Sequence, residues 1–155
     1  MTNSNNNTRL VIYKLPKNER VLYNLGYLLE KLCKKQKIGV FCDKEIIEMV
    51  DRELWTFSSN AFLPHNISKN SVEDNLQPVL LASNTNQIDR EIICIFNNTD
   101  LFKIIDDSNS NTIKNLKDII YMTQEEINVE DVKKSIQNIT ISCFEKTNNK
   151  WQKTL

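Results

Sequence analysis

The chain has only two glycines among its 155 residues, and this scarcity limits the ligands that it can hold. Phosphate-binding loops need glycine because a backbone without Cβ atoms lets its N–H groups approach the phosphate oxygens. Neither GxGxxG nor GxxxxGKS/T occurs, and the turn after the first predicted strand runs from Pro16 to Glu19 without glycine. The sequence therefore argues against an enzyme that binds a nucleotide through such a loop.

Histidine is also scarce, and the cysteines are not clustered. His65 is the single histidine, and the cysteines form no CxxC pair; they are Cys33, Cys42, Cys94 and Cys143. Structural zinc sites need four clustered nitrogen or sulfur ligands, so we expect no metal, and no cofactor is predicted either. Dispersed cysteines are typical of a reducing compartment, which favours a cytoplasmic protein.

Excess charge and long apolar runs are missing as well. Lys and Arg number 20, as do Asp and Glu, so the chain lacks the overall basic charge of many nucleic-acid-binding proteins. No apolar run approaches the ~20 residues of a membrane span. The polar N-terminus lacks the apolar stretch of a signal peptide. We expect no membrane association and a disordered polar segment over residues 1–8.

Hydrophobic periodicity predicts a single α/β domain over residues 9–155. Short β-branched apolar runs alternate with longer segments of helical spacing, the pattern of parallel strands connected by helices. Strands are predicted over 9–15, 38–42, 79–82, 91–96, 117–122 and, at an edge of the sheet, 139–144. Helices are predicted over 20–35, 43–55 with Asp43 as N-cap, 124–137 and, as shorter pieces, 100–105 and 112–116. The polar segments 83–90, a hairpin or loose connection, and 106–111 are predicted as loops.

Two groups of residues could serve catalysis. A cysteine could be activated by His65, but this needs an exposed thiol within hydrogen-bond reach of the imidazole. We interpret His65 instead as a loop residue that bonds to its own turn. The acidic pairs Asp106–Asp107 and Glu125–Glu126 are typical of a solvated loop and of a helix start. A nucleotide-binding or thiol enzyme is kept as an alternative function.

Aromatic residues gather where a predicted helix runs into a loop. Trp55 and Phe57 end the helix, and Phe62, Leu63 and Pro64 follow among small polar residues. Large apolar groups in loops either fold back onto the core or are covered by another molecule. We expect Trp55 and Phe57 to be largely core, whereas Phe62-Leu-Pro64 has the composition of an interface anchor.

A basic pair, Lys133–Lys134, lies on the last predicted helix, with Lys117 on a neighbouring element. Such a pair is typical of a solvated helix face. Its functional interpretation is the capture of an acidic peptide or a terminal carboxylate, for which lysine supplies a point charge. Both interpretations stay open on these residues alone.

Three segments together resemble the chi subunit family of bacterial DNA polymerase III. They are Leu54-Trp-Thr-Phe57, Ala61-Phe-Leu-Pro-His65 and Pro78-Val-Leu-Leu81, in that order and spacing. The resemblance begins near residue 9 and is densest between residues 45 and 81, and relative to the family the stretch 106–111 looks like an insertion. It implies a Rossmann-like, mostly parallel sheet with helices on both faces. It also implies a non-catalytic accessory protein that acts in DNA replication.

The resemblance further implies partners. Proteins of this family link the clamp-loader complex to single-stranded DNA-binding protein by gripping its acidic, phenylalanine-ended C-terminal tail, so contact with DNA is indirect. The aromatic loop is similar to one that meets the psi subunit or a repair helicase, which implies partner binding by Trp55, Phe57, Phe62, Leu63 and Pro64. The tail pocket of the family corresponds here to Lys133 and Lys134, with Lys117 nearby. A stand-alone interaction module for a repair helicase is a second alternative.

Overall fold

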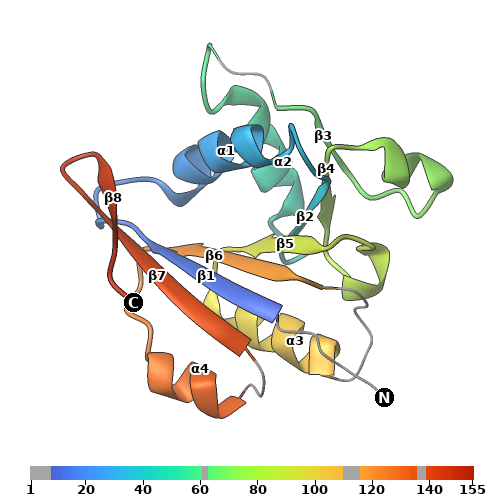
Figure 1. Ribbon diagram of the computed structural model, residues 1–155. Coiled ribbons are helices and arrows are strands. Elements are labelled where there is room, and N and C mark those ends of the chain that lie inside the picture. The colour runs from blue at the N-terminus through green and yellow to red at the C-terminus, as the bar shows by residue number, and fades with distance from the viewer. Residues whose placement is uncertain (1–7, 61–62, 110–115, 136–138) are drawn as a thin grey trace.

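The computed structural model describes residues 8–60, 63–109, 116–135 and 139–155, which build one sheet between two layers of helices (Figure 1). The described strands are β1 (Thr8–Lys14), β2 (Ile38–Phe41), β3 (His65–Ile67), β4 (Val79–Ala82), β5 (Ile92–Ile95), β6 (Asp118–Thr123), β7 (Ile139–Thr147) and β8 (Lys150–Lys153). Their order in the sheet is β3-β4-β2-β5-β6-β1-β7-β8. Neighbouring strands run parallel except β8, which pairs antiparallel with β7. The predicted α/β class with a mostly parallel sheet is confirmed.

Among the described residues, two helices cover each face of the sheet. On one face lie α1 (Val21–Leu32) and α2 (Ile47–Thr56), and on the other lie α3 (Asn98–Asn109) and α4 (Val129–Ser135) (Figure 1). Helices on both faces exclude water from both sides, so the strands β4 and β5 are buried at every position. The prediction of helices on both faces is therefore confirmed.

Alternate residues of each strand enter two separate cores, because successive side chains of a strand point to opposite faces. In β5, Cys94 joins the core beneath α1 and α2, where it packs in a cluster with Leu25 and Leu54. Its neighbour Ile93 joins the opposite core, in a cluster with Ile104 of α3. The apolar runs of the sequence thus supply both cores from the same short strands.

The helix starts differ from the predicted ones for local reasons. The Asp43 carboxylate accepts the backbone N–H of Glu45 at 3.0 Å and forms a separate turn, so α2 begins at Ile47 and the predicted Asp43 cap is wrong. The last helix begins at Val129 rather than at residue 124. The Asn128 side-chain oxygen accepts the N–H groups of Glu130 and Asp131 and satisfies the donors of the first turn.

The predicted loop over 106–111 is wrong for residues 106–109, which continue α3; residues 110 and 111 lie outside the described residues. A buried stripe formed by Leu101, Ile104 and Ile105 holds the helix on the sheet. The Thr85 hydroxyl donates to the Asp107 carboxylate at 2.5 Å, which gives this polar turn a partner in the fold. Composition alone does not reveal such a long-range partner.

Two expectations about connections are also wrong. The strands β4 and β5 are not a hairpin because β2 lies between them, and the segment joining them contains a 3-10 turn at Thr85–Gln87. The strand β7 is not an edge, since β8 pairs with it and forms the edge of the sheet. Residues 1–7 and 112–115 lie outside the described residues, so the predicted disordered N-terminal segment and short helix stay predictions.

Candidate protein-binding surfaces

Trp55 lies in the last turn of α2, and 47% of its surface is exposed, so the expectation that it is largely core is wrong. Its indole ring packs on the imidazole of His65, with ring centroids 4.2 Å apart and planes tilted by 36°. One face of the indole is thereby supported, while about half of the residue's surface is accessible. An exposed tryptophan on a fixed support is suited to anchoring a partner protein.

His65 joins the end of α2 to the edge strand β3. The residue is 2% exposed, and its imidazole has Nδ1 2.7 Å from the Leu63 carbonyl oxygen and Nε2 3.1 Å from the Asp51 carbonyl oxygen. Nε2 also lies 3.2 Å from a carboxylate oxygen of Asp51. The predicted bond to its own turn is confirmed, but His65 is a buried strand residue rather than an exposed loop residue. Its role in this structure is to fix the backbone that supports Trp55.

Phe57 and Leu63 are core residues in this structure. Phe57 is 8% exposed, and its ring packs edge-on against Tyr27 with centroids 5.1 Å apart. Leu63 is buried in the same core cluster, and Pro64 is half-buried. Phe62 lies outside the described residues, so its predicted contact with a partner stays a prediction. Of the five residues predicted for this surface, Trp55 and Pro64 are the described ones with accessible area.

Two of the predicted tail-binding lysines, Lys133 and Lys134, lie in α4, on the face of the sheet opposite α2, and the third, Lys117, directly precedes a strand. Lys133 and Lys134 are exposed in the last turn of α4, and Lys117 is exposed just before β6. Their described ion pairs are loose or solvated: Lys133 Nζ is 3.9 Å from Glu130, and Lys117 Nζ is 3.3 Å from Glu91. The strand register places the starts of β6, β1 and β7 level with each other, so α4 ends toward the same end of the sheet as Lys117. No described contact joins Lys117 to the other two lysines.

The thiol groups are poorly suited to the alternative of a thiol enzyme. Burial raises the pKa of Cys42 to about 12, and it also raises the pKa of Cys94, so neither thiol ionises near neutral pH. Burial raises the pKa values of the half-buried Cys33 and Cys143 as well. The described partners of His65 are Leu63, Asp51 and Trp55, none of which is a nucleophile for this chemistry.

Within the described residues, no three His, Cys, Asp or Glu side chains gather in a way that could hold a metal ion. None of the described helices has the length and apolar character that crossing a bilayer requires.

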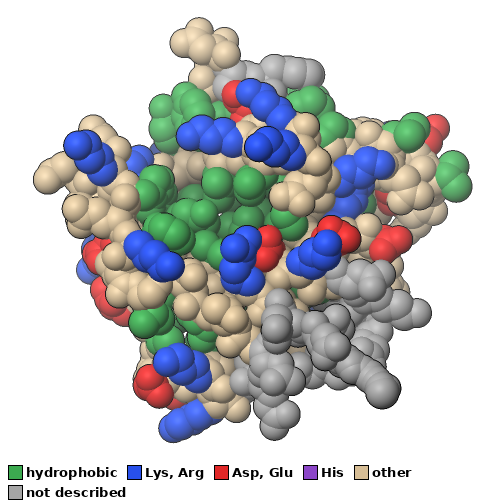
Figure 2. All heavy atoms as spheres, viewed as in Figure 1, with side chains coloured by type: hydrophobic (Ala, Val, Ile, Leu, Met, Phe, Trp, Pro, Cys, Tyr) green, Lys and Arg blue, Asp and Glu red, His purple; other side chains and the backbone are tan. Residues whose placement is uncertain are grey.

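A third surface combines aromatic side chains that the sequence reasoning did not bring together. Figure 2 shows apolar side chains gathered in a hollow on the face where α1 meets β1 and β7, with Lys and Arg side chains around it. Tyr23 and Tyr27 of α1 are exposed, as is Trp151 of β8. The signal in the sequence was the spacing of the two tyrosines by one helical turn beside the leucine stripe. Nothing local pointed to Trp151, which comes from the other end of the chain.

The structure is that of an α/β protein with a mostly parallel sheet and a core on each face, and it carries exposed aromatic and lysine side chains at its surface. The family model described as DNA polymerase III chi subunit, HolC, matches residues 8–135, and the chain belongs to this family. No curated protein matches the chain in sequence. Chi is a non-catalytic accessory subunit in the clamp-loader complex of polymerase III, so the chain has an accessory role in DNA replication. The resemblance based on the aromatic motifs is confirmed.

Proposed function

We propose that the protein is a cytoplasmic adaptor that links the clamp loader to single-stranded DNA-binding protein by binding the acidic C-terminal tail of the latter. The observation that carries the proposal is membership of the chi family over residues 8–135. It is supported by two separate surfaces of suitable chemistry, one aromatic and one basic, on opposite layers of the fold. An adaptor needs two such surfaces so that two partners bind without excluding each other.

The basic surface is the proposed site for the tail. An acidic tail that ends in phenylalanine carboxylate needs two or three cations, which Lys133, Lys134 and Lys117 supply. Their present partners are exposed, and solvated ion pairs contribute at most about 1 kcal/mol each, so the carboxylates of a ligand can replace them. Such binding weakens with added salt, because exposed charges are screened within about 8 Å at physiological ionic strength.

The aromatic surface is the proposed site for the psi subunit, another clamp-loader component or a repair helicase. Trp55 and Pro64 offer accessible apolar area, and Phe62 lies between them in the sequence. Phe57 and Leu63 do not contact the partner in this proposal. Their burial in the core fixes the backbone next to Trp55 and Pro64. A rigid anchor loses little conformational entropy when the partner binds, which favours affinity.

The tail site is tested by titrating a fluorescein-labelled acidic peptide that ends in Pro-Phe and following its anisotropy. Replacing both Lys133 and Lys134 by Ala should weaken binding about ten-fold, since two partly exposed ion pairs are lost. The matched control is the double variant Lys34→Ala and Lys35→Ala, another exposed adjacent pair, which should bind as the wild type does. Equal affinity in all three proteins would show that the tail binds elsewhere.

The loop site is tested by capture of purified clamp-loader components or of a candidate helicase. Trp55→Ala should abolish capture while lowering the melting temperature little, because the indole is half exposed. Met49→Ala is the control, since Met49 is a comparably exposed apolar residue on the same helix. Loss of capture in both variants, or in neither, argues against a specific Trp55 anchor. Saturable micromolar binding of ATP or NAD would instead favour the enzyme alternative.

A further inference from the structure

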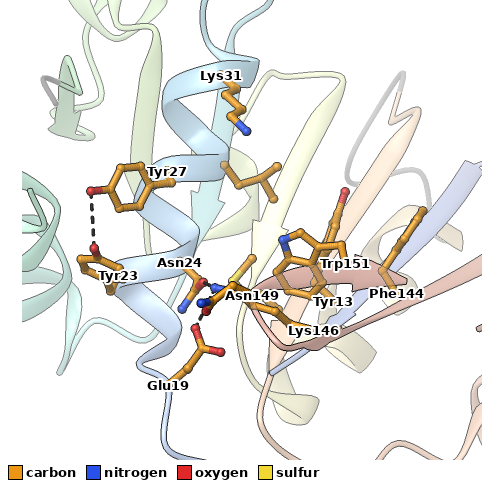
Figure 3. A pocket seen from close by; sticks show the side chains of 12 residues that line it. Tyr13, Glu19, Tyr23, Asn24, Tyr27, Lys31, Phe144, Lys146, Asn149 and Trp151 are labelled. Carbon is orange, nitrogen blue, oxygen red and sulfur yellow. Dashed lines mark hydrogen bonds and ion pairs between the residues drawn. The ribbon is translucent and has the colours of Figure 1, made fainter. Parts of the chain in front are cut away.

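A groove of about 710 Å³ runs between α1 and the hairpin formed by β7 and β8 (Figure 3). We call it the aromatic groove, after the five aromatic side chains that line it: Tyr13, Tyr23, Tyr27, Phe144 and Trp151. It is separate from Trp55 and from the lysines of α4, neither of which lines it. The proposed adaptor function makes no use of it.

The rings form two walls of different origin. Tyr13 of β1 stacks on Phe144 of β7 with centroids 5.4 Å apart, and it meets Trp151 of β8 edge-on at 5.1 Å. On the other side, Tyr23 and Tyr27 of α1 meet edge-on at 5.1 Å. Figure 3 shows these two groups standing on opposite sides of the groove. A ligand between them would contact aromatic surface on both sides.

A polar bridge fixes the width of the groove. Lys146 of β7 donates hydrogen bonds to the Glu19 carboxylate at 2.7 Å and to the Asn24 side-chain oxygen at 2.9 Å. The Lys146 and Glu19 side chains are mostly buried, so water screens this pair less than an exposed one. The bridge ties the hairpin to the start of α1 before any ligand arrives. Such preorganisation lowers the entropy lost on binding.

The groove also carries positive charge that is not balanced. Lys31 continues the row of Tyr23 and Tyr27 along α1 at i+4 spacing, and it lines the groove. Lys153 is paired with Phe144 across β7 and β8, so it projects from the same face of the hairpin. Neither lysine has an ion-pair partner among the described residues, whereas Lys146 is neutralised by Glu19. A ligand with acidic groups flanking an apolar centre would complement this arrangement.

The rings further supply hydrogen-bond donors. The Tyr13 hydroxyl and the Trp151 indole N–H have no hydrogen-bond partner among the described residues. Burial raises the pKa of Tyr13, so its hydroxyl keeps the proton at neutral pH. An extended polyproline II segment exposes backbone carbonyls that no internal hydrogen bond satisfies, whereas a helical ligand does not. Tyr23 and Lys31 lie about 12 Å apart along the helix axis, which matches about four residues of such a segment.

We propose that the aromatic groove binds a short, extended, proline-rich segment of a partner protein, flanked by acidic side chains. Proline rings pack between the two aromatic walls, the donors bond to the carbonyls of the segment, and Lys31 and Lys153 meet the flanking carboxylates. This site is independent of the adaptor function and of the tail site. A single-stranded nucleic acid is the less favoured occupant, because it needs cations along its whole track and the groove has two unpaired lysines, at its margins.

The test uses a fluorescein-labelled peptide, Glu-Glu-Pro-Pro-Leu-Pro-Glu-Glu, with an amidated C-terminus so that a terminal carboxylate plays no part. We expect saturable binding in anisotropy titrations. Replacing its prolines by glycine should weaken binding at least about ten-fold, because the preformed extended shape and the ring contacts are lost. Equal binding of the glycine peptide, or absence of saturation, would overturn the proposal.

Variants then locate the site. Tyr23→Ala and Lys31→Glu should each weaken peptide binding about five-fold or more, since both side chains are exposed at the groove. The controls are Met49→Ala and Lys44→Glu, exposed residues of the same kinds that do not line it, and these should bind normally. Displacement of the peptide by a thymidine oligonucleotide would assign the groove to nucleic acid. Displacement by the Phe-ended tail peptide would make it the tail site, and either result would refute our assignment.

Discussion

Gly26 in the middle of α1 offers a sharp test of how the two helices pack. A Cβ atom at Gly26 would lie 2.6 Å from Phe57 Cγ and 2.7 and 2.9 Å from the two Cδ atoms. The ring of Phe57 therefore rests directly on the backbone of α1. Such an approach is possible only at glycine, which explains a residue that is otherwise unfavourable inside a helix.

The change in the free energy of unfolding on Gly26→Ala is the sum of two opposing effects. Gly26→Ala gains about 1 kcal/mol of helix propensity. It also forces the Phe57 ring away, and overpacking of this kind costs about 1–3 kcal/mol. We expect a net destabilisation of about 1 kcal/mol in the wild type. When Phe57→Ala removes the ring, the clash is absent, so the same Gly26→Ala change should stabilise by about 1 kcal/mol.

The effect of Gly26→Ala on the unfolding free energy should therefore change sign when Phe57 is removed. A double-mutant cycle measures this, using urea unfolding followed by far-UV circular dichroism. Phe57→Ala alone should lower the free energy of unfolding by about 3 kcal/mol, because it empties a core position. Phe57→Leu is a milder second background if that variant is too unstable to analyse. The reasoning is refuted if Gly26→Ala stabilises the wild type, or if the two changes add within about 0.5 kcal/mol. The first outcome would mean that Phe57 is not seated on α1.

Three further predictions concern buried polar groups and thiols. Arg90→Met should lower the unfolding free energy by about 2–3 kcal/mol, because the buried guanidinium donates to the backbone carbonyls of Asp74, Gln77 and Pro78. Urea denaturation measures the loss. Burial raises the pKa of Asp100 above its ordinary 3.8, so the folded state binds a proton more tightly than the unfolded state. Stability from this group therefore falls as pH rises from 3.8 through the folded pKa, and Asp100→Asn should flatten the stability profile over that window and stabilise the protein at neutral pH. Iodoacetamide labelling followed by mass spectrometry should leave Cys42 and Cys94 unmodified in the native protein and modify them in urea, whereas the half-buried Cys33 and Cys143 react earlier.

Each of these has an outcome that contradicts it. An Arg90→Met variant as stable as the wild type would show that solvent satisfies these three backbone carbonyls. If Asp100→Asn and the wild type differ in stability by an amount that does not change with pH, that result would show that burial does not raise the pKa of Asp100. Rapid native labelling of Cys94 would place that thiol at the surface rather than in the core.

The candidate site was predictable from the sequence only in part. The motif around Trp55 identified the family and the region, because an aromatic cluster at a helix end is visible locally. The local sequence does not show which of the aromatic side chains faces solvent. Trp55 and Phe57 are two residues apart at the end of α2, yet the first is exposed on His65 and the second is buried on Gly26.

The amino-acid sequence by itself determined the α/β class, most strand positions and the family. Hydrophobic periodicity, runs of β-branched residues and the spacing of motifs are all local properties of the chain. Only the tertiary structure decided the strand order, the continuation of α3 through Asp106 and Asp107, and the aromatic groove. The groove brings Tyr13, Phe144 and Trp151 together through the pairing of β1 with β7 and of β7 with β8. Contacts between residues so distant in the chain depend on how the layers pack, and no short window of sequence contains that information.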